Sequence, residues 1–298
     1  MSDEAVAAEV NEVGVSVPLS VRLRFGHAAV QHLADEIGVD LLHIKGVAVD
    51  PELRSGRDSG SDVDVLVRPG HVDRLDRAMR RHGWRLYSTF EWGSPFGHAQ
   101  TYLHDAWGYV DIHRFFPGIR LEPGRAFEQF WRDRNEVQIA RIGCHVPSVT
   151  AQGVLLVLNA ARSTNGRSVD VRMAWVDAST ERRAEMTALV ADLDASVAFA
   201  AATGELERYR GERDYRLWKI VSEGGSRSAE WWARIRAAPN LGAALRVAAR
   251  APRVNVDHLA HRLGRAPTRG EVAGEFFRRP ARAVREAWRG IRRAEPGR

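Results

Sequence analysis

Two aspartates separated by a single valine form the first pattern that could bind a metal ion. Asp62 and Asp64 lie in SDVDVLV (61–67), where acids alternate with valines at the period of a β-strand. Alternate residues of a strand project from one face, so we expect both carboxylates on one face and Val63 and Val65 on the other. Adjacent carboxylates repel each other unless a cation neutralises them, and Mg²⁺ or Mn²⁺ suits such oxygen ligands. Two unrelated acids on a solvated strand remain the alternative.

A third aspartate, Asp111, lies in a second alternating segment, YVDIHRFF. Val110 and Ile112 alternate there with Tyr109, Asp111 and His113, which predicts that Asp111 lies on the polar face of another strand. Three carboxylates can bridge two metal ions about 3.5–4 Å apart, an arrangement that activates an attacking hydroxyl and stabilises a leaving pyrophosphate. The pattern therefore suits phosphoryl-type transfer, with an ordinary exposed strand residue as the alternative for Asp111.

A resemblance to a known family covers roughly residues 20 to 160 and rests on an ordered set of short motifs. The set consists of HIKG (43–46), an arginine at 57, SDVDVLV (61–67), HGW (82–84) and YVDIH (109–113). It resembles the uncharacterised nucleotidyltransferase family of the DNA polymerase β superfamily. The resemblance implies a small mixed sheet with flanking helices, magnesium held by Asp62, Asp64 and Asp111, and a nucleoside triphosphate as donor substrate.

One motif departs from the wider superfamily, whose Gly-Ser signature ahead of the acids is replaced here by Lys45-Gly46. Gly60 and Ser61 directly precede Asp62, too close to substitute for that signature, although we include Ser61 among the expected nucleotide-binding residues. The Lys45 ammonium and the backbone of Gly46 could approach phosphate oxygens.

Arg57 is the remaining cation expected at the nucleotide, to which it could offer a bidentate guanidinium. Lysine is rare in this chain, occurring only as Lys45 and Lys219, which favours a role for Lys45. Simple exposure to solvent is the alternative for both Lys45 and Arg57.

The elements that must position these residues alternate between helix and strand. We expect a helix over 17–37, strands at 41–45 and 62–67, a helix from Val72 to Gly83, an extended stretch at 84–90 and a hairpin of 98–104 with 109–115.

The loop 105–108 would pair Tyr102 with Asp111 and Gln100 with His113. Tyr102 and Gln100 would then flank the third acid and shape a substrate pocket, and a register error of one residue would move them to the other face. His113 could orient Asp111 or contact substrate, with a structural histidine as the alternative.

Beyond Pro147 the strand patterns give way to alanine-rich helical patterns, beginning with Ser148 as an N-cap. We therefore predict an α+β chain with two domains. The first, 1–146, is an α/β nucleotidyltransferase-like domain with a small mixed β-sheet, and the second, 147–298, is helical with a basic amphipathic tail.

The net charge of +6 is concentrated in that tail. From Phe276 onward there are eight arginines and two glutamates, a surplus equal to the net charge of the whole chain. The segment ARAVREAWRGIRR places apolar residues on one helical side and arginines on most of the rest. Such a helix could dock on its own domain, lie on an anionic membrane or bind RNA phosphates.

Composition excludes several other classes of protein. The single cysteine, Cys144, rules out an intramolecular disulfide and a thiolate zinc cage. The N-terminus lacks an apolar signal core, and the longest apolar stretch, 154–161, is too short to span a bilayer, so we expect a cytoplasmic protein without a transmembrane segment.

The sequence thus predicts a metal-dependent nucleotidyltransferase that transfers a nucleotidyl group, most simply AMP from ATP, to a hydroxyl of a small molecule, peptide or protein. Two other functions stay open. One is a toxin-like enzyme that acts on RNA or a tRNA end, with the basic tail binding phosphates. The other is a nucleotide-binding module without catalysis.

Overall fold

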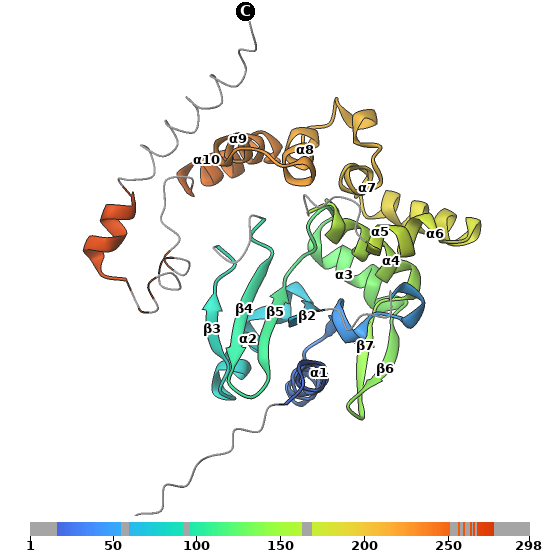
Figure 1. Ribbon diagram of the computed structural model, residues 1–298, viewed down its shortest axis with the longest axis vertical. Coiled ribbons are helices and arrows are strands. Elements are labelled where there is room, and N and C mark those ends of the chain that lie inside the picture. Colours follow the sequence, from blue (N-terminus) through green and yellow to red (C-terminus); the bar gives the residue numbers. More distant parts are fainter. Residues whose placement is uncertain are drawn as a thin grey trace, which may run out of the picture.

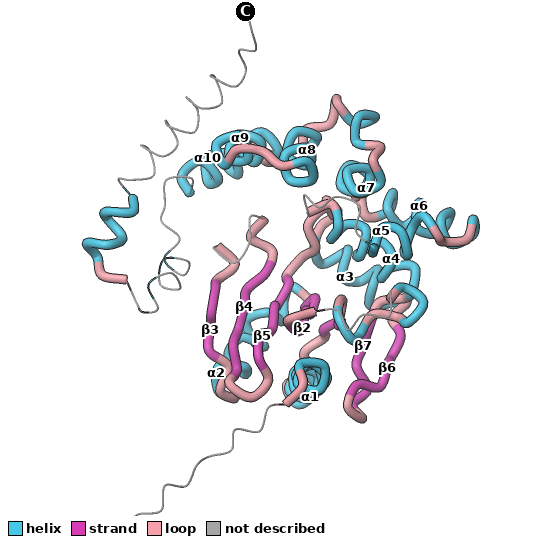
Figure 2. The backbone as a smooth tube through the Cα atoms, viewed as in Figure 1, coloured by secondary structure: helices cyan, strands magenta, loops and turns pink. Residues whose placement is uncertain are grey.

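The computed structural model describes residues 17–54, 60–91, 96–162, 169–250, 256, 259, 263, 265 and 267–276. Five strands form one sheet in the first half, and every described element after residue 146 is helical (Figures 1 and 2). The predicted α+β class, a mixed sheet followed by a helical region, is confirmed. Residues 277–298, and with them the predicted tail helix, lie outside the described residues.

The sheet has the strand order β1-β2-β5-β4-β3. Its strands are β1 (Leu41–His43), β2 (Asp62–Val67), β3 (Arg85–Ser88), β4 (Ala99–His104) and β5 (Gly108–His113). The central pair, β2 and β5, is parallel, whereas every other neighbouring pair is antiparallel. The sheet is therefore mixed, and its two parallel strands are the two that carry the predicted metal-binding acids.

One face of the sheet is covered by α1 (Leu19–Glu36) and α2 (Val72–Arg81). The valines that alternate with the acids of β2 lie on this face and are fully buried, together with Val110 and Ile112 of β5. They pack against apolar residues of the two helices, namely Leu23, Val30, Leu33, Leu75 and Met79. The alternation therefore divides β2 into a buried valine face and an acid face, as its sequence predicts.

The opposite face becomes apolar only beyond the acids. Leu42 and Leu66, which are register partners on β1 and β2, join a cluster with α3 (Pro123–Arg132) and α4 (Val149–Ala160). The N-cap of α4 is Ser148, whose hydroxyl accepts a hydrogen bond from the Ala151 amide, as predicted. The acid face of the sheet is thus closed at one end by α3 and by α4, the first helix of the second half.

Further helices continue this second half of the chain. They are α5 (Val169–Val171), the π-helical turn η4 (Arg172–Val176), α6 (Thr180–Asp192), α7 (Ser196–Thr203), η5 (Leu206–Tyr209), α8 (Tyr215–Glu223), α9 (Arg227–Ala237) and α10 (Leu241–Arg250). In Figure 1, α8 to α10 follow one another in an arc beyond the ends of β3 and β4. Within the described ranges, no helix combines the length and apolar character needed to cross a membrane.

A separate two-stranded sheet ends the first half of the chain and packs against α1, β1 and the turn at Gly46–Ala48. Its strands, β6 (Asn135–Ile139) and β7 (Ile142–Val146), form an antiparallel hairpin that the sequence patterns did not predict. The hairpin turns at Ala140 and Arg141, both with positive φ, and its inner side packs on Val47 and Ala48. Cys144 is buried in this small cluster, where burial raises the pKa of its thiol to about 12.

The register of the hairpin between β4 and β5 differs from the predicted register by one residue. His104 pairs with Gly108, so the loop has three residues instead of four, and Gly108 has a φ of +82°. A three-residue hairpin loop is typically followed by a residue in this left-handed conformation, which glycine adopts without strain. Thr101, rather than Tyr102, therefore lies opposite Asp111.

The loop between β5 and α3 packs against α7 of the second half, so a substitution in this loop measures how closely the two halves pack. Gly118 in this loop has a φ of +100°, and an added Cβ would lie 2.7 Å from Cβ of Ala198 in α7. Gly118→Ala should lower the free energy of unfolding by about 1–2 kcal/mol for the left-handed backbone and a further about 1–3 kcal/mol for overpacking. Urea unfolding measures the loss.

Gly204→Ala is the matched control, because Gly204 has a φ of +85° with no atom within 4 Å of its added Cβ. This variant should lose only the backbone contribution. Equal losses in the two variants would show that the contact between Gly118 and α7 is loose.

Candidate metal centre

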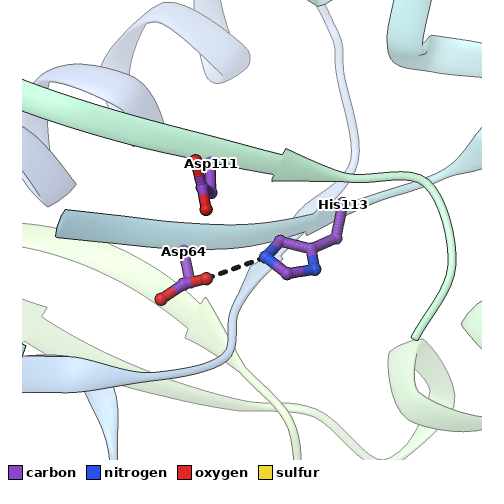
Figure 3. A group of neighbouring side chains, drawn as sticks. All are labelled: Asp64, Asp111 and His113. Atoms are coloured by element: carbon purple, nitrogen blue, oxygen red, sulfur yellow. Dashed lines mark hydrogen bonds and ion pairs between the residues drawn. The ribbon is translucent and has the colours of Figure 1, made fainter. Parts of the chain in front are cut away.

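Asp64 and Asp111 lie directly opposite each other on the parallel strands β2 and β5. With His113, two residues further along β5, they form a group whose ligand atoms all lie within 4.8 Å of one another (Figure 3). All three side chains project from the same face of the sheet, because Asp111 and His113 are alternate residues of one strand. The parallel register thus brings together residues that are far apart in the sequence.

Asp64 is the most buried acid of the group, with 4% of its surface exposed. Its Oδ1 accepts hydrogen bonds from Nζ of Lys45 and Nε2 of His113, both at 2.7 Å. Burial alone would raise the pKa of the carboxyl, but the Lys45 ammonium and the His113 hydrogen bond outweigh it and hold that pKa well below its usual range. Asp64 is therefore a carboxylate at every pH at which the protein would work.

Asp111 has the opposite electrostatic behaviour. Burial and the neighbouring charge of Asp64 raise the pKa of its carboxyl to about 6, although a hydrogen bond from Thr101 lowers it. Thr101 donates from Oγ1 to Oδ1 of Asp111 at 2.6 Å, and within the described part of the chain no side chain donates to the second carboxylate oxygen. The two opposed acids thus share a face on which full ionisation of both is unfavourable without a cation.

Asp62 lies on the same strand face, two residues before Asp64, but outside the three-residue group. It is partly exposed, and burial together with the charge of Asp64 raises its pKa. Ser61 donates a hydrogen bond to Asp62 Oδ1 at 3.3 Å. The structure therefore places Asp62 at the more open end of the acid face, next to the pair formed by Asp64 and Asp111.

The structure describes most, but not all, of the residues that we expect to bind the nucleotide. Lys45 comes directly before the short 3₁₀ turn η1 (Gly46–Ala48) and forms an ion pair with Asp64. Gly46 has a φ of +64°, and its Cα would lie 3.6 Å from a Cβ added to Gly60, so the two glycine segments adjoin at the start of β2. Arg57 lies outside the described residues.

Two predicted substrate residues lie on the wrong face, because the predicted register was off by one residue. Tyr102 and Gln100 alternate with Thr101 and so project away from Asp111, toward α2. There the Tyr102 hydroxyl hydrogen bonds to Asp76 and to the amide of Gln100. His113 is close to the acids as predicted, but its hydrogen bond goes to Asp64 rather than to Asp111.

Three residues of the site carried no signal in the sequence analysis. Thr101 would have followed from the correct hairpin register. His98 lies against His113, with ring centroids 4.9 Å apart. Arg162, just after α4, is partly buried, and burial lowers the pKa of its guanidinium while Asp64 and Asp111 raise it. Arg162 comes from the second half of the chain, and only the tertiary structure brings it near the acids.

The donor set fits a hard divalent cation. Carboxylate oxygens are the ligands that Mg²⁺ and Mn²⁺ prefer, and a cation between Asp64 and Asp111 would relieve the repulsion that raises the Asp111 pKa. His113 already uses Nε2 on Asp64 and Thr101 holds Oδ1 of Asp111, so both acids are oriented by a neighbouring side chain. Hydrogen-bonded ligands of this kind are typical of metal centres.

Comparisons with known proteins give only distant likenesses. No family model and no curated protein matches the chain. It is similar to the solved structure of the lincosamide antibiotic adenylyltransferase LnuA with lincomycin bound, at 15% identity and a TM-score of 0.33, over 55% of this chain and 94% of that chain.

Two further solved structures show likenesses of the same order. The antibiotic-resistance factor ANT(2'')-Ia aligns at 15% identity and a TM-score of 0.34, over 64% of this chain and 93% of that chain. An antigenic nucleotidyltransferase-like protein from Paracoccidioides brasiliensis aligns at 15% identity and a TM-score of 0.37, over 60% of this chain and 93% of that chain.

The raised pKa of Asp111 predicts a stability that depends on pH. In the native state this carboxyl takes up a proton at about pH 6, whereas its ordinary value is 3.8. A carboxyl whose pKa is raised in the native state destabilises that state at pH values above the native pKa. The destabilisation disappears at pH values below the pKa of the same group in the unfolded chain. Without metal, Asp111→Asn should therefore raise the free energy of unfolding at about pH 8 by up to about 3 kcal/mol.

This gain should shrink as the pH falls through 6 and should be mostly lost near pH 4, as measured by urea unfolding in the presence of a chelator. Asp105→Asn is the control, because Asp105 is an exposed acid at the hairpin turn that is paired with Arg85. It should give no gain at either pH. A destabilised Asp111→Asn protein at pH 8 would mean that the Asp111 charge is satisfied by the fold itself.

Proposed function

We propose that the protein is a metal-dependent nucleotidyltransferase that transfers a nucleotidyl group, most simply AMP from ATP, to a hydroxyl of a small molecule, peptide or protein. The observation that carries the proposal is the pairing of Asp64 with Asp111 on adjacent parallel strands, with Asp62 on the same face. The resemblance of the sequence motifs to nucleotidyltransferases supports it. The domain division at residue 146 belongs to the same proposal, with the helical second half as a domain of its own.

Asp62, Asp64 and Asp111 are the residues that would hold Mg²⁺ or Mn²⁺. The bound ions would lower the pKa of the acceptor hydroxyl and stabilise the leaving pyrophosphate. Asp62 lies at the more exposed end of the acid face and Asp64 at the buried end, with Asp111 opposite Asp64. A nucleotide would therefore reach the acids from the Asp62 end.

The surrounding residues prepare the acids for this role. Lys45 and His113 keep Asp64 ionised and fix the oxygen that they share. Thr101 fixes one oxygen of Asp111, so the other can face a cation or take up a proton. Lys45, Gly46 and Ser61 line the start of β2, where they would contact the triphosphate, and Arg57 belongs to the same proposed set.

The experiment that tests the function is incubation of the full chain with each α-labelled nucleoside triphosphate, MgCl₂ and a cell extract. We expect label to appear on one class of acceptor, to require the divalent ion and to be released by a treatment that cleaves phosphodiester or phosphoester bonds. The proposal would be contradicted if no acceptor became labelled with any of the four triphosphates under conditions in which the protein is folded and binds Mg²⁺.

Removal of a single acid should abolish transfer without unfolding the protein. Asp64→Asn and Asp62→Asn each remove one charge from the metal site, and we expect turnover to fall at least about a hundredfold, the size typical of losing one preorganised electrostatic group. In Asp64→Asn the new amide oxygen can still accept the hydrogen bonds of Lys45 and His113, so the fold should persist. Turnover near wild type in either variant would place the metal elsewhere.

Lys45→Ala should affect the triphosphate more than the acceptor. The proposal assigns the ammonium to phosphate oxygens, so the apparent KM for the triphosphate should rise while the KM for the acceptor stays close to wild type. Loss of a cation beside Asp64 should leave the affinity for Mg²⁺ unchanged or higher. An unchanged KM for the triphosphate would restrict Lys45 to holding Asp64.

A further inference from the structure

Arg162 is a partly buried cation whose charge the described structure does not neutralise. It follows α4, and its backbone amide donates to the carbonyl of Asn159. Its Nη1 is buried without a hydrogen-bond partner, and no ion pair of its guanidinium is present in the described part of the chain. A guanidinium offers five donors and stays protonated, so leaving the donors of Nη1 unpaired away from water is costly.

The position of Arg162 connects this cation with the acid face. Asp64 and Asp111 are the two groups whose charges favour its protonated form, against the effect of burial. Neither acid forms an ion pair with it. Oδ1 of Asp64 is already occupied by Lys45 and His113, and Oδ1 of Asp111 by Thr101. Arg162 is thus near enough to interact with the metal-binding acids, yet it is not held by them.

Another arginine shows how this chain stabilises a guanidinium for purely structural purposes. Arg120, also partly buried, forms ion pairs with Asp194, Glu212 and Asp214 at 2.7 to 3.2 Å and joins the β5–α3 loop to the helices. Four of its hydrogen bonds are made to carboxylates. Arg162 has no comparable set among the described residues, so a structural role does not account for its burial beside the site.

We propose that Arg162 binds phosphate oxygens of the nucleoside triphosphate, and that the helical half thereby contributes directly to the active site. This inference rests on the proposed nucleotidyltransferase function. Guanidinium binds phosphate through two parallel hydrogen bonds, and a polyphosphate carries enough negative charge to balance the guanidinium and the metal ions together. The acids serve the metal ions, while Arg162 supplies donors that only an incoming anion can satisfy.

The ligand-free protein should tolerate loss of this charge. Arg162→Met removes a partly buried cation that has no ion pair among the described residues but keeps an apolar chain, so its melting temperature without ligand should equal or exceed that of wild type. Arg208→Met, at an exposed arginine paired with Glu205, is the control for an equal change in net charge. A marked fall in the melting temperature of Arg162→Met alone would assign Arg162 to the fold and overturn the proposal.

Binding of inorganic tripolyphosphate to the full chain, by calorimetry in saturating MgCl₂, is the decisive measurement. We expect Arg162→Met to weaken tripolyphosphate about 10- to 100-fold, Arg162→Lys to recover only part of this loss, and Arg208→Met to bind like wild type. The affinity for Mg²⁺ alone should not fall in any of them. Equal tripolyphosphate affinity in wild type and Arg162→Met, or wild-type protein that binds Mg²⁺ but no tripolyphosphate, would overturn the proposal.

The binding measurement separates this inference from the proposed function. Tripolyphosphate binding that depends on Arg162 would stand even if no nucleotidyl transfer were found, and would then mark a polyphosphate-binding protein. Nucleotidyl transfer with an unchanged triphosphate KM in Arg162→Met would keep the function and remove Arg162 from it.

Discussion

The parallel pairing of β2 with β5 is the constraint on which the site depends. It places Asp64 directly opposite Asp111, at the spacing of neighbouring strands of about 4.8 Å, so the two carboxylates cannot move apart without breaking the sheet. The valines on the other face fix this register, because a shift by one residue would bury the acids under α1 and α2. Hydrophobic burial on one side of the sheet thus maintains electrostatic repulsion on the other.

The two opposed acids respond to this repulsion in different ways. Asp64 is held ionised by Lys45 and His113, whereas Asp111 accepts a hydrogen bond from the hydroxyl of Thr101 and has a pKa of about 6. One acid is a permanent charge, and the other exchanges a proton near neutral pH. This difference comes from their neighbours rather than from their own positions, since both lie on the same face in register.

The features that could be predicted from the sequence are those that local periodicity determines. Alternation of acids with valines placed Asp62 and Asp64 on one face, and the change of pattern after Pro147 predicted the helical half. The hairpin register was wrong because Gly108, taken as a loop residue, adopts a positive φ while pairing with His104. Arg162 could not be predicted, since the packing of α4 on the sheet, rather than any spacing, brings it to the acids.

The graded exposure of the acid face has a kinetic consequence. Along β2, the residues on this face change from partly exposed Asp62 to buried Asp64 and then to Leu66, which is 3% exposed and packed under the helices. The face is open at its Asp62 end and closed by apolar side chains at the other, so an ion arriving from solvent meets Asp62 before Asp64. Under the proposed function, Asp62 would therefore set how quickly an ion enters, whereas the inner pair of acids would set how long it stays.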